Sequence, residues 1–118
     1  MEGEIGMKDG IVFKILKVLQ SHKGKNRPIT ARKLSAKLRL PERQVRSLIS
    51  ELVTKEKILI ASSVQKPFGF YLITDIDELK ECLGQYYSRL KNLKERAQSL
   101  YKAGLKRFSR EIQHEFKF

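Results

Sequence analysis

The chain has one cysteine among its 118 residues, Cys82, and this excludes an internal disulfide. The position of Cys82 within a helical pattern favours a buried, apolar role over a reactive one. Long hydrophobic runs are also absent, since none approaches the roughly 18 apolar residues of a membrane-spanning helix. The first ten residues, MEGEIGMKDG, lack the basic and then apolar character of a secretory signal. We therefore expect a cytosolic protein that has no membrane partner.

Residues that could carry catalysis or bind a metal are scarce. The two histidines, His22 and His114, have no Cys or His at metal-ligand spacing. No segment resembles a phosphate-binding glycine loop or the sharp turn that presents a nucleophile. The acidic cluster of Asp75, Asp77 and Glu78 is explained by the start of a helix, where negative charge is favoured. The sequence thus predicts no enzyme activity, no metal, no cofactor and no small-molecule substrate.

Acidic residues are outnumbered, with 13 Asp and Glu against 25 Lys and Arg, so the net charge is +12. From Lys14 to Arg46 the chain carries eleven basic residues and one acidic residue, Glu42. Isolated lysines are usually a solvated surface, but a segment this one-sided favours binding to a polyanion such as nucleic acid. The length indicates one domain with a modest core.

Residues 29–60, ITARKLSAKLRLPERQVRSLISELVTKEKILI, predict two short helices and then a strand. Thr30 is a good N-cap for a helix that has Leu34 and Leu38 on one face. Pro41 ends this helix and is well placed to open the next one. The second helix repeats its apolar residues at i, i+3, i+4 and i+7, namely Val45, Leu48, Ile49 and Leu52. Its polar face then holds Glu42, Arg43, Arg46, Ser47 and Ser50.

The flanking segments complete a recognisable order of elements. Residues 1–7 are expected to be a mobile tail, and a first helix is predicted over about residues 9–20. The basic loop SHKGKNRP follows, and residues 27–29 could form a short edge strand. Two β-prone runs, 58–62 and 68–73, are separated by a hairpin tip at residues 63–67. The predicted order is therefore helix, helix, helix and hairpin.

Residues 11–74 resemble the winged helix-turn-helix domain of bacterial and phage DNA-binding proteins, through the segments ITARKLSAKL, LPERQVRSLI and GFYLI. The resemblance implies a protein of the cytoplasm and nucleoid that binds double-stranded DNA, as a transcriptional regulator or a replication accessory factor. Two departures stand out: Pro41 replaces the usual Ser or Thr cap, and residues 55–57 lack the usual glycine before the hairpin. Because this fold also serves as an interaction module, a protein scaffold is the alternative function.

The resemblance also implies which residues contact DNA. The first half of the second helix of the pair would read bases in the major groove, through Arg43, Gln44, Arg46 and Ser47. Phosphate contacts would come from Thr30, Arg32 and Lys33, and from Lys66 at the hairpin tip. For each of the two arginines, an ion pair with Glu42 or Glu51 is the alternative interpretation.

The remaining residues, about 74–113, predict one long helix, opened by a possible capping box of Thr74 and Asp77. Its apolar residues alternate steps of three and four, as in a coiled coil: Leu79, Leu83, Tyr86, Leu90, Leu93, Ala97 and Leu100. This seam predicts a homodimer or a partner protein. In a parallel homodimer Arg89 would face Lys94 of the other copy, which weakens that pair without excluding an antiparallel or shifted one. An acidic partner helix would fit better. The basic charge of the helix would also allow it to lie along DNA.

The sequence as a whole predicts a mainly α protein with a small β-hairpin. Residues 1–7 would be the tail, residues 8–74 a winged helix-turn-helix domain, and residues 75–118 a long, coiled-coil-like helix for dimerisation or partner docking. A third possibility is binding to single-stranded nucleic acid or RNA through Tyr86, Tyr87 and Tyr101. Tyrosines at these positions are more often part of an interface.

Overall fold

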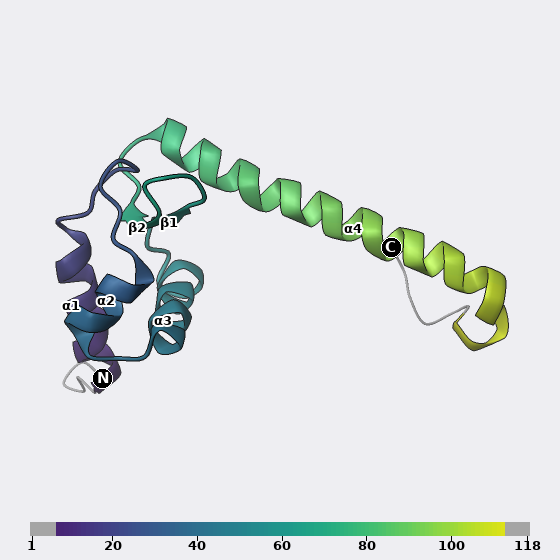
Figure 1. Cartoon of the computed structure of the whole chain (residues 1–118), viewed down its shortest axis with the longest axis horizontal. Coiled ribbons are helices and arrows are strands. Elements are labelled where there is room, and N and C mark those ends of the chain that lie inside the picture. The colour runs from purple at the N-terminus through teal and green to yellow at the C-terminus, as the bar shows by residue number, and fades with distance from the viewer. Residues whose placement is uncertain (1–6, 113–118) are drawn as a thin grey trace. The chain divides into compact units, whose positions relative to one another are not determined.

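The computed structural model describes residues 7–112 and is mainly helical, with one two-stranded antiparallel hairpin and a long C-terminal helix (Figure 1). This architecture confirms the predicted fold class. The elements in chain order are α1 (Met7–Leu19), α2 (Ala31–Leu38), α3 (Glu42–Thr54), β1 (Ile60–Ser63), β2 (Gly69–Leu72) and α4 (Ile76–Ile112). The described residues fall into two compact units, the first ending at Lys80 and the second beginning at Glu81. Apart from Met7, which begins α1, the predicted N-terminal tail lies outside the described residues.

Helix α2 begins and ends for identifiable local reasons. The Thr30 hydroxyl oxygen accepts a hydrogen bond from the Lys33 amide at 3.1 Å, which confirms the predicted N-cap. Arg39 ends the helix in the left-handed conformation, at φ 58° and ψ 44°. The Leu40 amide then donates to the Ser35 carbonyl oxygen at 3.2 Å, and the Ser35 hydroxyl donates to the Leu40 carbonyl oxygen. Arg39 thus takes the left-handed conformation that glycine usually adopts after a helix, and this makes the turn between α2 and α3 short.

Helix α3 has Pro41 as an N-cap that makes no side-chain hydrogen bond, as expected. The helix ends at Thr54, and Lys57 then adopts a positive φ of 59°. The Lys57 ammonium donates to the Thr54 carbonyl oxygen at 3.1 Å, which satisfies one of the last carbonyl groups of the helix. Lys57 thus adopts a left-handed backbone conformation within the segment that lacks the glycine usual in the resembled domains.

The hairpin pairs β1 with β2 in a register that runs from Ile60 opposite Leu72 to Ser63 opposite Gly69. Ile29 adds a single antiparallel bridge to Phe70, so the predicted edge strand at residues 27–29 is one residue long. Gly69 has φ 138°, and a Cβ built on it would lie 2.4 Å from the Ile29 carbonyl oxygen. Only glycine allows the two backbones to approach this closely.

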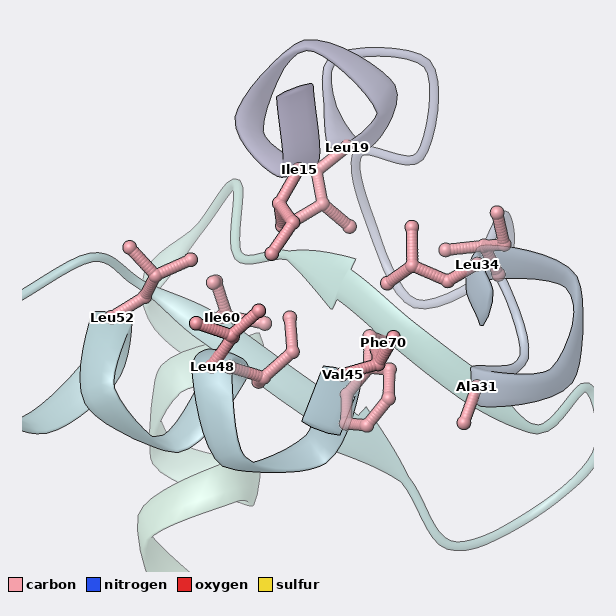
Figure 2. Packing of buried hydrophobic residues seen from close by; sticks show 11 residues of the cluster. Ile15, Leu19, Ala31, Leu34, Val45, Leu48, Leu52, Ile60 and Phe70 are labelled. Atoms are coloured by element: carbon pink, nitrogen blue, oxygen red, sulfur yellow. The ribbon is translucent and has the colours of Figure 1, made fainter. Parts of the chain in front are cut away.

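The first unit has one hydrophobic core, to which α1, α2, α3 and the hairpin all contribute buried side chains (Figure 2). The predicted apolar face of α3 is buried in full. Figure 2 shows side chains from α1, α2, α3 and the hairpin pointing into the same interior. The buried residues of this cluster are Ile15, Leu19, Ile29, Ala31, Leu34, Val45, Leu48, Ile49, Leu52, Ile60 and Phe70.

Helix α4 opens with a capping arrangement that lies one residue later than predicted. The Asp75 carboxylate accepts from the Glu78 amide at 2.9 Å, so the box of Thr74 and Asp77 was wrong. The buried Glu78 carboxylate accepts from the Thr74 amide at 2.8 Å, the Thr74 hydroxyl at 3.0 Å and the Lys25 amide at 2.9 Å. Burial raises the pKa of Glu78, but these hydrogen bonds together hold the pKa below its usual range.

The helical geometry of α4 is interrupted at Phe108, which has φ −125° and ψ 38°. Figure 1 shows the helix changing direction near its C-terminal end. The regular part of α4 therefore runs from Ile76 to the residue before Phe108, and it contains the entire predicted seam.

Candidate nucleic-acid interface

The exposed face of α3 carries all four residues predicted to read bases. Arg43, Gln44, Arg46 and Ser47 are exposed, because the opposite face of the helix is packed into the core. A helix that is fixed by its buried side in this way presents its polar side chains from a rigid backbone. Such a rigid row of donors and acceptors is suited to the edges of bases in a major groove.

The two arginines of this face have different surroundings. The Arg46 guanidinium lies over the ring of Phe70, with its central carbon 5.9 Å from the ring centroid. This contact joins α3 to β2 and gives Arg46 a structural role that sequence reasoning missed. Within the part of the chain that the structure describes, the side chain of Arg43 has no hydrogen-bond or ring partner. Arg43 is therefore the less constrained of the two donors.

The start of α2 presents the predicted phosphate-contacting residues with one qualification. Arg32 and Lys33 are exposed, whereas Thr30 is half-buried and its oxygen already accepts from the Lys33 amide. The Arg32 amide precedes the first intrahelical hydrogen bonds of α2, whereas Ala31 is buried. The start of α2 can thus offer two basic side chains to an anion at the positive end of the helix dipole.

The hairpin tip contains exposed Lys66 between two exposed apolar side chains, Val64 and Phe68. About half of each apolar side chain is accessible, at 55% for Val64 and 51% for Phe68. The Ser63 hydroxyl donates to the Gln65 carbonyl oxygen at 2.6 Å, which closes the turn. Sequence reasoning placed the tip but missed its apolar residues, although their place beside the turn residues was a usable signal.

The basic loop between α1 and α2 is tied to the hairpin and contains His22. The Leu72 amide donates to the His22 carbonyl oxygen at 3.0 Å, and the Gly24 amide donates to the Leu72 carbonyl oxygen at 2.9 Å. His22 donates from Nδ1 to the Arg27 carbonyl oxygen at 2.8 Å. These bonds give His22 a structural role in ordering the loop.

The second unit presents most of the predicted seam to solvent. The exposed fractions are 41% for Leu83, 49% for Tyr86, 58% for Leu90, 59% for Leu93 and 69% for Leu100. Ala97 is half-buried, and so is Leu79, which belongs to the first unit. Cys82 is buried as expected, and this burial raises the pKa of its thiol.

Other kinds of site find no support within residues 7–112. That described part contains no group of three or more His, Cys, Asp or Glu side chains that could hold a metal ion. None of its helices is long and apolar enough to cross a membrane. Comparisons with models of protein families, with curated proteins and with solved structures gave no match.

Proposed function

We propose that the first unit binds double-stranded DNA through α3, in the manner of a winged helix-turn-helix domain. The observation that supports this most is the division of α3 into a fully packed apolar face and an exposed face bearing Arg43, Gln44, Arg46 and Ser47. Eleven basic residues against one acidic residue between Lys14 and Arg46 would attract the phosphate backbone. A solvated surface alone would have no need of this imbalance.

In the proposed complex α3 lies in the major groove. Arginine offers a planar pair of donors that can bond guanine through two hydrogen bonds, and Gln44 can bond adenine in the same way. The start of α2 and Lys66 at the hairpin tip would hold phosphates and fix the register without reading sequence. By occupying a site, the protein would block or recruit other machinery, as a transcriptional regulator or a phage or bacterial replication accessory factor.

The first test measures binding of the full chain to a fluorescent random duplex by anisotropy across a salt series. We expect tight binding at low salt and a steep linear fall of log K with log salt concentration, because counterions are released from the phosphates. Absence of binding even at low salt would overturn the proposed function. The Arg32→Ala and Lys33→Ala variants should each reduce the salt slope by about 1 if these residues contact phosphate.

A second test addresses base reading by α3. Selection from a random pool would first identify a preferred duplex, and Arg43→Ala would then be compared on that duplex and on a random one. We expect a loss of roughly 5- to 150-fold on the preferred site, equivalent to about 1–3 kcal/mol, and a smaller loss on the random duplex. The control is Lys17→Ala, which removes one exposed charge from α1 and should weaken binding to both duplexes alike. Equal losses of Arg43→Ala on both duplexes would refute a role of Arg43 in base reading.

A second candidate function is docking to a partner protein, with the first unit as a scaffold. The exposed leucines of α4 favour it, because phosphate groups cannot cover apolar side chains. The two functions are compatible, since they use different residues and can be tested separately.

A further inference from the structure

Six residues of the second unit form a continuous apolar face on α4, which we name the α4 seam. Their alternating steps of three and four bring them to one side of a helix, at the a and d positions of a heptad repeat. Five of the six are at least 41% exposed. The α4 seam consists of Leu83, Tyr86, Leu90, Leu93, Ala97 and Leu100.

The positions that flank the α4 seam carry charge of one sign. In the same heptad register Arg89 and Arg96 occupy g positions and Lys94 occupies an e position, and no acidic residue lies at a flanking position between Leu83 and Leu100. The Arg89 guanidinium lies 4.9 Å from the centroid of the Tyr86 ring, and its Nε donates to the Gln85 carbonyl oxygen at 3.5 Å. Arg89 therefore holds a positive charge directly beside the seam.

This charge pattern argues against a second copy of the chain as the partner. In a parallel pair Arg89 would face Lys94 of the other copy. In an antiparallel pair g positions face g positions, so with the two seams aligned Arg89 would meet Arg96 of the other copy. Both orientations place like charges together, and such pairs are destabilising.

The width of the apolar face argues for a helix as the partner. Helices that lie on a membrane surface have a broad apolar face, whereas the α4 seam is the narrow a and d stripe of a coiled coil, bordered closely by charge. DNA offers phosphates for the flanks but nothing apolar for the leucines. We infer that the α4 seam binds a partner helix that has its own apolar heptad seam and carries Glu or Asp at the flanking positions, opposite Arg89, Lys94 and Arg96.

The test titrates the full chain into labelled synthetic peptides and follows their fluorescence anisotropy. The probe is a peptide of about four heptads with Leu at a and d and Glu at every e and g position, and its counterpart carries Lys instead of Glu. We expect the Glu peptide to bind at least about tenfold more tightly than the Lys peptide. The double variant Leu90→Ala and Leu93→Ala should weaken binding of the Glu peptide by about tenfold or more, because it removes two seam residues and keeps helix-forming side chains.

A charge reversal supplies the sharper comparison. The triple variant Arg89→Glu, Lys94→Glu and Arg96→Glu should prefer the Lys peptide to the Glu peptide. The matched control reverses three exposed charges away from the flanks, Lys91→Glu, Lys102→Glu and Lys106→Glu, and so changes the net charge equally. The control should retain its preference for the Glu peptide.

Four outcomes would overturn the inference: equal binding of the two peptides, no binding of either, loss of the preference in the control, or no inversion in the triple variant. Sedimentation of the chain alone as a dimer that the Leu90 and Leu93 double variant converts to monomer would assign the seam to a second copy. Binding to phosphatidylserine vesicles that depends on Leu90 and Leu93, without binding of the Glu peptide, would assign it to a membrane. None of these results bears on DNA binding by Arg43, so the two proposals fail independently.

Discussion

Replacing Gly69 with alanine should destabilise the first unit by about 3–5 kcal/mol, because two effects act at one position. An alanine Cβ would lie 2.4 Å from the Ile29 carbonyl oxygen, 2.5 Å from the Ile29 carbonyl carbon and 2.9 Å from the Thr30 nitrogen. All three atoms belong to the backbone, so no side chain can move aside. The φ of 138° is in addition a conformation that residues with a Cβ rarely adopt.

The magnitude follows from what must give way. Holding alanine in this conformation costs about 1–3 kcal/mol. Moving the backbone apart breaks the bridge in which Phe70 donates to Ile29 at 2.7 Å and Ile29 donates to Phe70 at 2.9 Å. Each of these hydrogen bonds contributes about 1 kcal/mol net. Small domains have a total stability of about 5–15 kcal/mol, so a large share of it would be lost.

Urea denaturation followed by circular dichroism measures this loss. The free energy of unfolding of each protein is obtained from the midpoint and slope of its transition. Gly10→Ala is the matched control, since Gly10 lies within α1 and an added Cβ would meet nothing within 4 Å. The control should gain about 1 kcal/mol, because alanine is the better helix former. Gly69→Ala with a free energy of unfolding within about 1 kcal/mol of wild type would refute the close-approach argument.

Three further substitutions test the local structure of the same unit. The lowered pKa of Glu78 means that its carboxylate stabilises the fold above the ordinary glutamate pKa and that this contribution is lost as pH falls through the lowered value. Glu78→Gln should therefore reduce the change in the free energy of unfolding between neutral and acidic pH. An unchanged pH dependence in the variant would contradict this. Arg39→Gly should raise the free energy of unfolding by about 1 kcal/mol, since glycine adopts the left-handed conformation without strain, and a loss in urea denaturation would count against it. Thr30→Ala should lower the free energy of thermal unfolding by about 1 kcal/mol through loss of the N-cap, and Thr30→Ser should restore it. An alanine variant as stable as wild type would show that the cap does not stabilise the fold.

The helices were the most predictable part of the fold, because their signals are local. The spacing of Val45, Leu48, Ile49 and Leu52 predicted which face of α3 is buried, and the structure buries all four. Thr30 and Pro41 marked the starts of α2 and α3 to within one residue. The capping register of α4 was less predictable, because closely spaced acidic residues offer two overlapping boxes, and the contact of Glu78 with the distant Lys25 amide is not visible in the local sequence.

The candidate interface was predictable in its residues but not in their surroundings. Periodicity alone placed Arg43, Gln44, Arg46 and Ser47 on the exposed side of α3. The contact of Arg46 with Phe70 joins residues on α3 and β2, and no pattern within either segment indicates it. The predicted alternatives for this arginine, ion pairs with Glu42 and Glu51, both lie within α3, since the pattern of a helix indicates contacts only along that helix.

The sequence by itself determined the elements, their buried and exposed faces, the positive charge and the heptad spacing of α4, because each of these depends on residues within a few turns of one another. The tertiary structure decided which distant backbones meet. It brought Ile29 against Gly69, which makes that glycine indispensable, and it brought the Lys25 amide to Glu78, which lies 53 residues away. Such contacts arise only when the core has closed, so no local propensity encodes them.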